Sequence, residues 1–383
     1  MTIVAGGRVL APEGWHDDCD VVAAGGRIVA IGPGLAHRGA EVVDARGLLV
    51  APGFVDVHVH GAAGAMFEDG SIDANRHVLA TLAPLGTTGV LATVAALPPE
   101  GLLAAVRAIA AAALGGGGAR VLGIHLEGPF LSPRRAGAQN PDWMRPPSVA
   151  EFNAVQRACG GLVRLVTVAP ELPGALAFIA AVRQRGVRVA LGHSEASAAQ
   201  VDDAIAAGAT QVTHLFNAMA GLHHRAPGLV GVALDDARLA VEVIADGVHV
   251  DPRLLRLAAR CKSDGGLLLV SDGVAAVGAA AGPLQLFGAA CVAGDAVRRC
   301  DDGRLAGSCL TLARAVANMG TWLPEWPRAA VLAAASASPA RAVGLAASEA
   351  GALVVGAPAD VVLLDPALCL RGVVLGGRTQ FNQ

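Results

Sequence analysis

The sequence predicts an α/β protein: a (β/α)₈ TIM barrel with a small β-sandwich domain formed by both termini. Three observations favour this fold. The chain has 383 residues and 54% hydrophobic residues, enough for one large core. Apolar strand-like runs alternate with alanine-rich helical stretches through its middle. Short strands separated by glycine turns occupy both ends. The eight strands expected in the barrel cover 54–60, 89–95, 121–127, 163–169, 187–193, 210–216, 240–246 and 267–272.

The helices fit the gaps between these strands. Ser148 and Ser197 stand at plausible capping positions, and 174–186 and 251–262 alternate apolar with charged residues. The two ends share a texture, as in 27–31 and 359–365, so we expect them to form one β-domain. The predicted division is 1–51 for the first part of that domain, 52–345 for the catalytic barrel and 346–383 for the second part.

Composition excludes several classes of protein. A net charge of −3 gives no reason to expect nucleic acid or a membrane as partner. Residues 273–294 carry no charge, but Pro283 and repeated glycines disfavour a membrane-spanning helix there. The first ten residues lack the features of a signal peptide, and the seven cysteines form no C-x-x-C pair. We therefore expect a cytoplasmic protein with reduced thiols.

Ionisable residues stand where several expected strands end. In a barrel these ends meet at one mouth, so the side chains would converge. Imidazole and carboxylate groups can hold zinc or a similar ion while leaving one coordination position open. An ordinary histidine pair and a turn-capping aspartate are the structural alternatives. The residues are His58, His60, Glu127, His193, His214 and Asp272.

Six motifs, in this order, carry a family resemblance: PGFVDVHVHG (52–61), HLEGPF (125–130), GHS (192–194), THLFNAM (213–219), ADGVH (245–249) and LAGS (305–308). Together they resemble the N-acetylglucosamine-6-phosphate deacetylases of the amidohydrolase superfamily, across nearly the whole chain. The resemblance implies metal-dependent removal of acetate from an amino-sugar phosphate, in amino-sugar catabolism.

The resemblance also implies roles for these residues. Glu127, His193 and His214 match the metal ligands, and Asp272 matches the catalytic acid/base. His58 and His60 match a pair that allows a second ion. The implied cofactor is a divalent metal, one or two ions, with Zn²⁺ favoured and Fe²⁺ as the alternative.

Substrate contacts and the quaternary state are implied in the same way. The arginine that matches Arg225 reaches the neighbouring subunit's site, so a homodimer is implied. Gln139 stands where the family normally has histidine, which leaves the sugar open. The alternatives are a related substrate such as N-acetylgalactosamine-6-phosphate, or a non-catalytic scaffold. The expected substrate-binding residues are Ala138, Gln139, Asn217, Ala218, Arg225, His249, Leu305, Ala306 and Gly307.

Overall fold

Eight parallel strands form the centre of the molecule in the computed structural model, which describes residues 1–35, 39–262 and 265–382. Neighbours in sequence are neighbours in this sheet. The ring closes where the Asp272 N–H donates to the His58 carbonyl over 2.9 Å. The barrel is thereby confirmed. Its strands are β6 (Phe54–Val59), β9 (Thr87–Ala95), β10 (Arg120–Glu127), β11 (Val163–Val168), β12 (Arg188–Leu191), β13 (Gln211–Val212), β14 (Ala240–Ile244) and β15 (Leu267–Val270).

Six of the eight barrel strands end one to four residues before the predicted position. The predicted ranges 187–193 and 210–216 end instead at Leu191 and Val212. His193 and His214 have φ angles of 48° and 29°, in the left-handed region, so the extended backbone cannot continue through them. Both histidines therefore lie in loops just beyond the strand ends.

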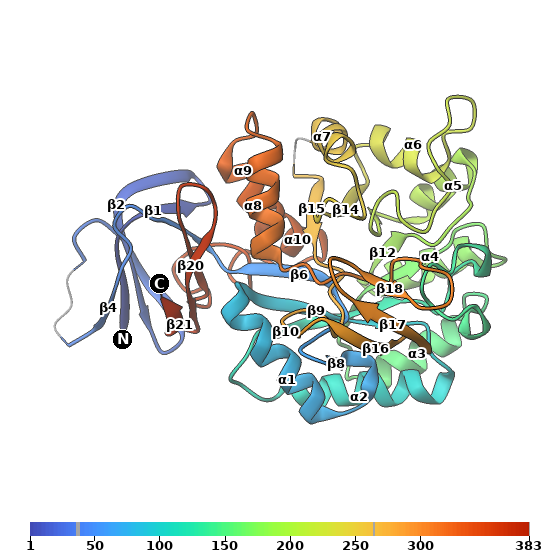
Figure 1. Cartoon of the computed structure of the whole chain (residues 1–383), viewed down its shortest axis with the longest axis horizontal. Helices are drawn as coiled ribbons and strands as arrows, with labels where there is room; N and C mark the ends of the chain where they lie inside the picture. The colour runs from blue at the N-terminus through green and yellow to red at the C-terminus, as the bar shows by residue number, and fades with distance from the viewer. Residues whose placement is uncertain (36–38, 263–264, 383) are drawn as a thin grey trace.

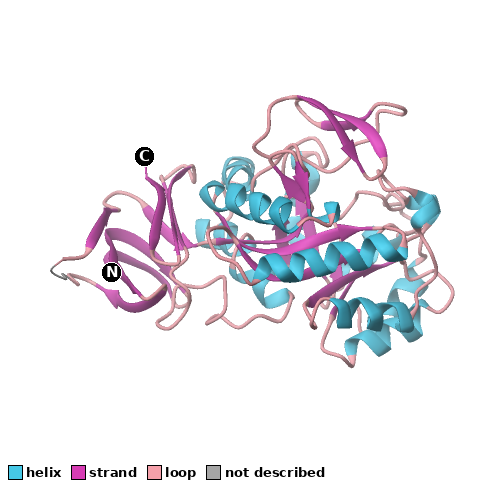
Figure 2. Ribbon diagram, turned by 90° about the horizontal axis from the view of Figure 1, so that it is seen from below, coloured by secondary structure: helices cyan, strands magenta, loops and turns pink. Residues whose placement is uncertain are grey.

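Helices surround the barrel, as Figure 2 shows. Ser148 and Ser197 cap α3 and α5, as predicted, each accepting a hydrogen bond from a backbone N–H in the first turn. The helices are α1 (Ile72–Leu82), α2 (Pro99–Ala113), α3 (Val149–Ala158), α4 (Ala175–Arg183), α5 (Ala198–Ala207), α6 (Gly228–Asp235), α7 (Pro252–Cys261), α8 (Leu312–Trp322), α9 (Arg328–Ala334) and α10 (Ala337–Ala342). No helix in the described part of the chain is long and apolar enough to cross a membrane.

The two ends of the chain share a second sheet to one side of the barrel (Figure 1). This sheet has its own apolar core, to which Val9, Val21 and Val361 belong. An ion pair of 2.8 Å between Arg120 and Asp360 ties it to the barrel. The shared β-layer is as predicted, whereas the boundaries at 51 and 345 stay a prediction. Its strands are β1 (Thr2–Ala11), β2 (Gly14–Ala24), β3 (Arg27–Gly32), β4 (Glu41–Asp44), β5 (Leu49–Pro52), β19 (Val361–Leu364), β20 (Leu370–Leu375) and β21 (Arg378–Asn382).

A small antiparallel sheet follows the last barrel strand. It consists of β16 (Gly282–Leu286), β17 (Ala289–Ala293) and β18 (Val297–Arg299). The uncharged run 273–294 is thus a loop and a hairpin, in agreement with the prediction that it is no membrane helix. Phe287, in the turn of this hairpin, stacks edge-on against His60 with ring centres 5.3 Å apart. The hairpin therefore covers part of the barrel mouth.

Candidate active site

Six ionisable residues converge at the mouth of the barrel. They form two groups, and within each group one ligand atom per residue lies within 4.8 Å of the others. All six residues are buried. The strand ends thus bring together the residues singled out in the sequence. One group is His58, His60 and Asp272, and the other is Glu127, His193 and His214.

Glu127 lies between the two groups. Its Oε1 is 3.1 Å from Nε2 of His193 and 2.9 Å from Nε2 of His214. Nε2 of His58 is 3.3 Å from the same oxygen, and Nε2 of His60 is 3.3 Å from Oε2. One carboxylate therefore faces four imidazole nitrogens at once.

The backbone at the mouth is strained. His193, His214 and Asp272 all have positive φ, and the value for Asp272 is 49°. Non-glycine residues adopt this region uncommonly, and strained backbone concentrates at functional sites. The three residues thus lie in turns directly beyond strand ends, where their ligand atoms belong to the two groups.

Opposite charges dominate the electrostatics of the site. Burial lowers the pKa of His58, but Glu127, Glu242 and Asp272 outweigh this and raise the pKa to about 10. Burial raises the pKa of Glu127, yet His58, His193 and His214 hold that pKa well below its usual range. The site therefore holds an ionised carboxylate among basic nitrogens.

Asp272 occupies the edge of this arrangement. Its Oδ1 is 3.4 Å from Nε2 of His60 and 3.5 Å from Nε2 of His58. Burial raises the pKa of Asp272, but the hydrogen bond from His60 and the charge of His58 outweigh it and lower the pKa. The carboxylate therefore stays ionised at neutral pH.

A cavity of about 240 Å³ opens above these groups. Its wall includes most of the expected substrate residues, whereas Ala306 is fully buried and does not line it. Arg225 lies on an exposed loop, where its guanidinium is 2.8 Å from Nε2 of His224. Phe287 and Arg304 also line the cavity and were missed in the sequence, because neither belongs to a recognisable motif. The expected residues in the wall are Ala138, Gln139, Asn217, Ala218, His249, Leu305 and Gly307.

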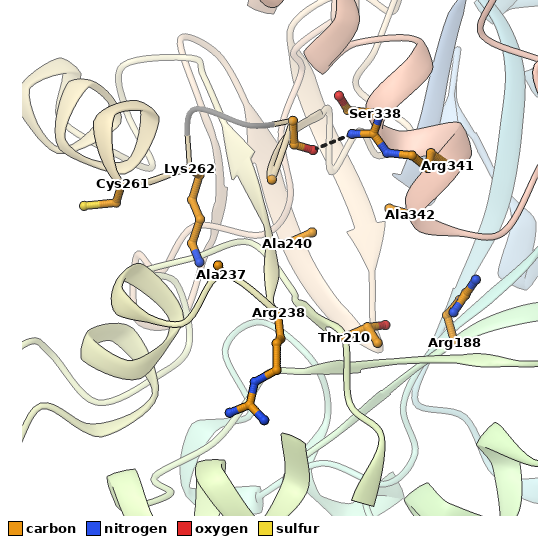
Figure 3. A pocket seen from close by; sticks show the side chains of 12 residues that line it. Arg188, Thr210, Ala237, Arg238, Ala240, Cys261, Lys262, Ser338, Arg341 and Ala342 are labelled. Atoms are coloured by element: carbon orange, nitrogen blue, oxygen red, sulfur yellow. Dashed lines mark hydrogen bonds between the residues drawn. The ribbon is translucent and has the colours of Figure 1, made fainter. Parts of the chain in front are cut away.

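A second hollow, of about 320 Å³, lies at the opposite end of the strands (Figure 3). Arg188 and Ala240, which begin β12 and β14, line it. Three of its four basic side chains bond to the chain itself: Lys262 donates to the Asp236 carbonyl, Arg341 to the Gly265 carbonyl and Arg238 to the Asp236 carboxylate. This end of a barrel generally serves stability, so the reactive groups belong to the mouth.

Comparison with known proteins agrees with this geometry. Residues 49–380 match the model of the amidohydrolase family. The chain belongs to the amidohydrolase family. Among its relatives, the N-acetylgalactosamine-6-phosphate deacetylase of Escherichia coli O157:H7 is 37% identical and covers 97% of each chain. The N-acetylglucosamine-6-phosphate deacetylase of Bacillus subtilis is 35% identical over 83% of this chain and 81% of that protein.

A solved structure shows the same agreement. It is an aspartate-to-alanine variant of N-acetyl-D-glucosamine-6-phosphate deacetylase from Mycobacterium smegmatis, in complex with N-acetyl-D-glucosamine-6-phosphate. It superposes on this chain with a TM-score of 0.91 at 35% identity, covering 99% of this chain and 98% of its own. The similarity therefore extends over the terminal sheet as well as the barrel.

Membership of the amidohydrolase family implies a divalent metal, and the donors at the mouth fit one. Nitrogen and carboxylate oxygen are ligands that zinc and related ions accept. Nε2 of His58 is buried and makes no hydrogen bond of good geometry within the described residues, although Oε1 of Glu127 lies 3.3 Å away. An unpaired buried nitrogen costs free energy unless a ligand satisfies it. The residues present thus suit the cofactor that the family implies.

Two carboxylates behind the histidines were not foreseen. Glu242 lies on β14 and contacts His58, and Glu68 contacts His60. The sequence did contain one signal for Glu242, a charged residue inside the apolar strand 240–244. Charged residues are seldom fully buried unless they are paired. Glu68 lies in a short 3-10 helix and carries no such signal.

Proposed function

We propose that this chain hydrolyses N-acetylglucosamine-6-phosphate to glucosamine-6-phosphate and acetate. The observation that carries the proposal is the meeting of Glu127, His193, His214 and Asp272 beneath one cavity, in a chain similar over its whole length to deacetylases. A non-catalytic scaffold would not need this set of ligands. The reaction belongs to amino-sugar catabolism.

Glu127, His193 and His214 would hold the first ion, with His58 and His60 available to a second. When bound, such an ion polarises a carbonyl and lowers the pKa of water from 15.7 to about 7. We propose Zn²⁺, with Fe²⁺ as the alternative, because the donors are imidazoles and carboxylates.

Asp272 would move the proton. Its ionised carboxylate borders the cavity, where it can take a proton from the water that attacks the acetyl carbon. The new C–O bond forms, the amide C–N bond breaks, and Asp272 returns the proton to the leaving nitrogen. Water is thereby split between acetate and the free amine.

His249 is the candidate for the phosphate within this chain. Its Nδ1 is 2.7 Å from Oδ2 of Asp246, and the residue lines the cavity. Backbone amides near Asn217 and Ala218 would complete the site. We further propose a homodimer in which the exposed Arg225 reaches the partner's site. Its test is the mass of the protein in solution.

We also propose a cytoplasmic location. The seven cysteines are free, four of them exposed, which suits a reducing compartment. The expected partner is the small-molecule substrate, with neither nucleic acid nor membrane.

A panel of N-acetyl sugars tests the function. The panel contains N-acetylglucosamine and N-acetylgalactosamine, each with and without a 6-phosphate, and release of free amine is measured. We expect kcat/KM for the phosphorylated sugars to be larger by at least ~10², because charge-assisted hydrogen bonds of about 1.5–3 kcal/mol each are lost without phosphate. Equal turnover without phosphate would contradict the roles of His249 and Arg225.

The same panel separates the two epimers. N-acetylgalactosamine-6-phosphate is the second candidate, because the Escherichia coli relative at 37% identity is named for it. We expect the glucosamine epimer to have the higher kcat/KM. A reversed preference would assign this chain to the second substrate.

A further inference from the structure

His58 and His60, at the end of the first barrel strand β6, each have a carboxylate of their own behind the ring. Nδ1 of His58 lies 2.9 Å from Oε2 of Glu242, and Nδ1 of His60 lies 2.9 Å from Oε1 of Glu68. On the other side of each ring, Nε2 faces Asp272 over 3.5 Å and 3.4 Å. The two rings are tilted by 60° to each other but have the same partners, with a carboxylate at Nδ1 and Asp272 at Nε2.

This orientation selects one protonated form of each imidazole. A carboxylate accepts hydrogen bonds, so each Nδ1 carries the proton that is donated to it. A metal at Nε2 would displace any proton there and leave the one on Nδ1, the form in which histidine binds a metal. Carboxylate partners of this kind fix the ring and increase the basicity of the ligating nitrogen.

Glu242 also contacts the other ligand group, which contains His214. Its Oε2 accepts a hydrogen bond of 3.3 Å from the backbone N–H of His214. Glu242 is fully buried on β14 and is not part of the cavity wall. It cannot touch a substrate in the cavity, so any effect on the reaction must pass through His58 or His214.

Glu68 is held in a different way. It lies in the short 3-10 helix η1 (Phe67–Asp69), which follows β8 (Ala65–Met66). Its Oε1 also accepts a hydrogen bond of 3.1 Å from the Ala95 N–H, at the end of β9. The side chain is 10% exposed, against 0% for Glu242. Its position thus depends on a turn and a neighbouring strand end.

We propose that Glu242 and Glu68 are positioning residues that hold His58 and His60 with Nε2 toward a second metal ion, and so determine whether that ion binds. The proposal rests on the ligand roles given above under the proposed function. It adds that the histidine pair alone is insufficient, because without the carboxylates neither ring has a fixed tautomer or direction.

The test is the number of metal ions per chain in the full-length protein. Zinc is added to the metal-stripped protein and measured by elemental analysis after dialysis. We expect about two ions per chain for the unchanged protein and about one for Glu242→Ala and Glu68→Ala. The affinity for the second ion, at His58 and His60, should fall ~10–100-fold in these variants. Glu242→Gln keeps an acceptor oxygen for Nδ1–H and should retain the second ion.

Asp20→Asn is the matched control. Asp20 is a buried carboxylate that accepts hydrogen bonds from the Gly6 and Leu35 N–H groups in the terminal sheet. Its loss should reduce thermal stability without changing the metal count. Deacetylation is assayed separately: excess zinc should restore kcat in Glu242→Ala, as expected if the residue acts through metal binding.

Several results would overturn the proposal. These are a full metal count in Glu242→Ala and Glu68→Ala, equal loss in Glu242→Gln, or a count of one in the unchanged protein. If Glu242→Ala does not fold, the partly exposed Glu68→Ala and the isosteric Glu242→Gln decide the question. Failure of the proposed function would appear instead as absent amine release with a normal metal count.

Discussion

Nε2 of Gln139 donates a hydrogen bond of 2.6 Å to Oε2 of Glu127. Its Oε1 accepts a second bond, of 2.8 Å, from the Ala96 N–H. Gln139 is 3% exposed. The residue expected to contact the sugar therefore also supports the carboxylate that lies between both groups of ligands.

Replacing Gln139 by leucine should weaken metal binding. Glu127 would lose a donor and the Ala96 N–H its acceptor, at a cost of about 1–3 kcal/mol in unfolding free energy. We expect metal affinity to fall ~10–100-fold, measured by competition with a chelator. Gln139→His keeps a donor and serves as the control. A change in KM alone, with normal metal affinity, would restrict Gln139 to a sugar contact.

Replacing Asp272 by asparagine should leave the ion at Glu127, His193 and His214 in place and lower kcat by at least ~10², because the amide cannot carry the proton. Steady-state assays and elemental analysis measure the two effects. Asp202→Asn, an exposed change on α5, is the control and should be neutral. Normal turnover in Asp272→Asn would show that Asp272 does not carry the proton.

Replacing His58 and His60 together by alanine should remove one ion per chain. The variant should also unfold more readily, since the buried Glu242 and the partly exposed Glu68 lose their partners. Elemental analysis and thermal unfolding report these results. His77→Ala, on the exposed side of α1, provides the histidine control. An unchanged metal count would show that His58 and His60 do not bind a metal ion.

Replacing Asp246 by asparagine should raise KM for 6-phosphorylated sugars, because His249 loses the carboxylate that orients it. The metal count should not change. Burial raises the pKa of Asp246, but the hydrogen bond and charge of His249 outweigh it and lower the pKa. Equal KM values for variant and unchanged protein would place His249 outside phosphate binding.

The same lowered pKa makes a prediction about stability. A carboxyl whose pKa is lower in the folded state stabilises it above the unfolded value of about 3.9, and this contribution is lost as the pH falls through the folded value. The stability difference between Asp246→Asn and the unchanged protein should therefore shrink in acid. Urea unfolding at neutral and acidic pH measures it, and a constant difference would contradict the assignment.

Much of this protein follows from the sequence alone. The sequence predicted all eight barrel strands, the shared terminal sheet and the caps at Ser148 and Ser197. These features depend on the spacing of apolar residues, on turn residues and on capping residues, which are local properties of the chain. The six ionisable residues at the mouth were found because strand ends in a barrel share one edge.

Only the tertiary structure decided how those residues are supported. His58 and Glu242 are 184 positions apart, and their contact depends on the closure of the barrel. Gln139 and Phe287 reach the site from loops whose paths no periodicity describes. The left-handed turns at His193 and His214 ended the strands early. The sequence by itself determined which ionisable groups meet at the mouth, whereas long-range packing determined which partners orient them.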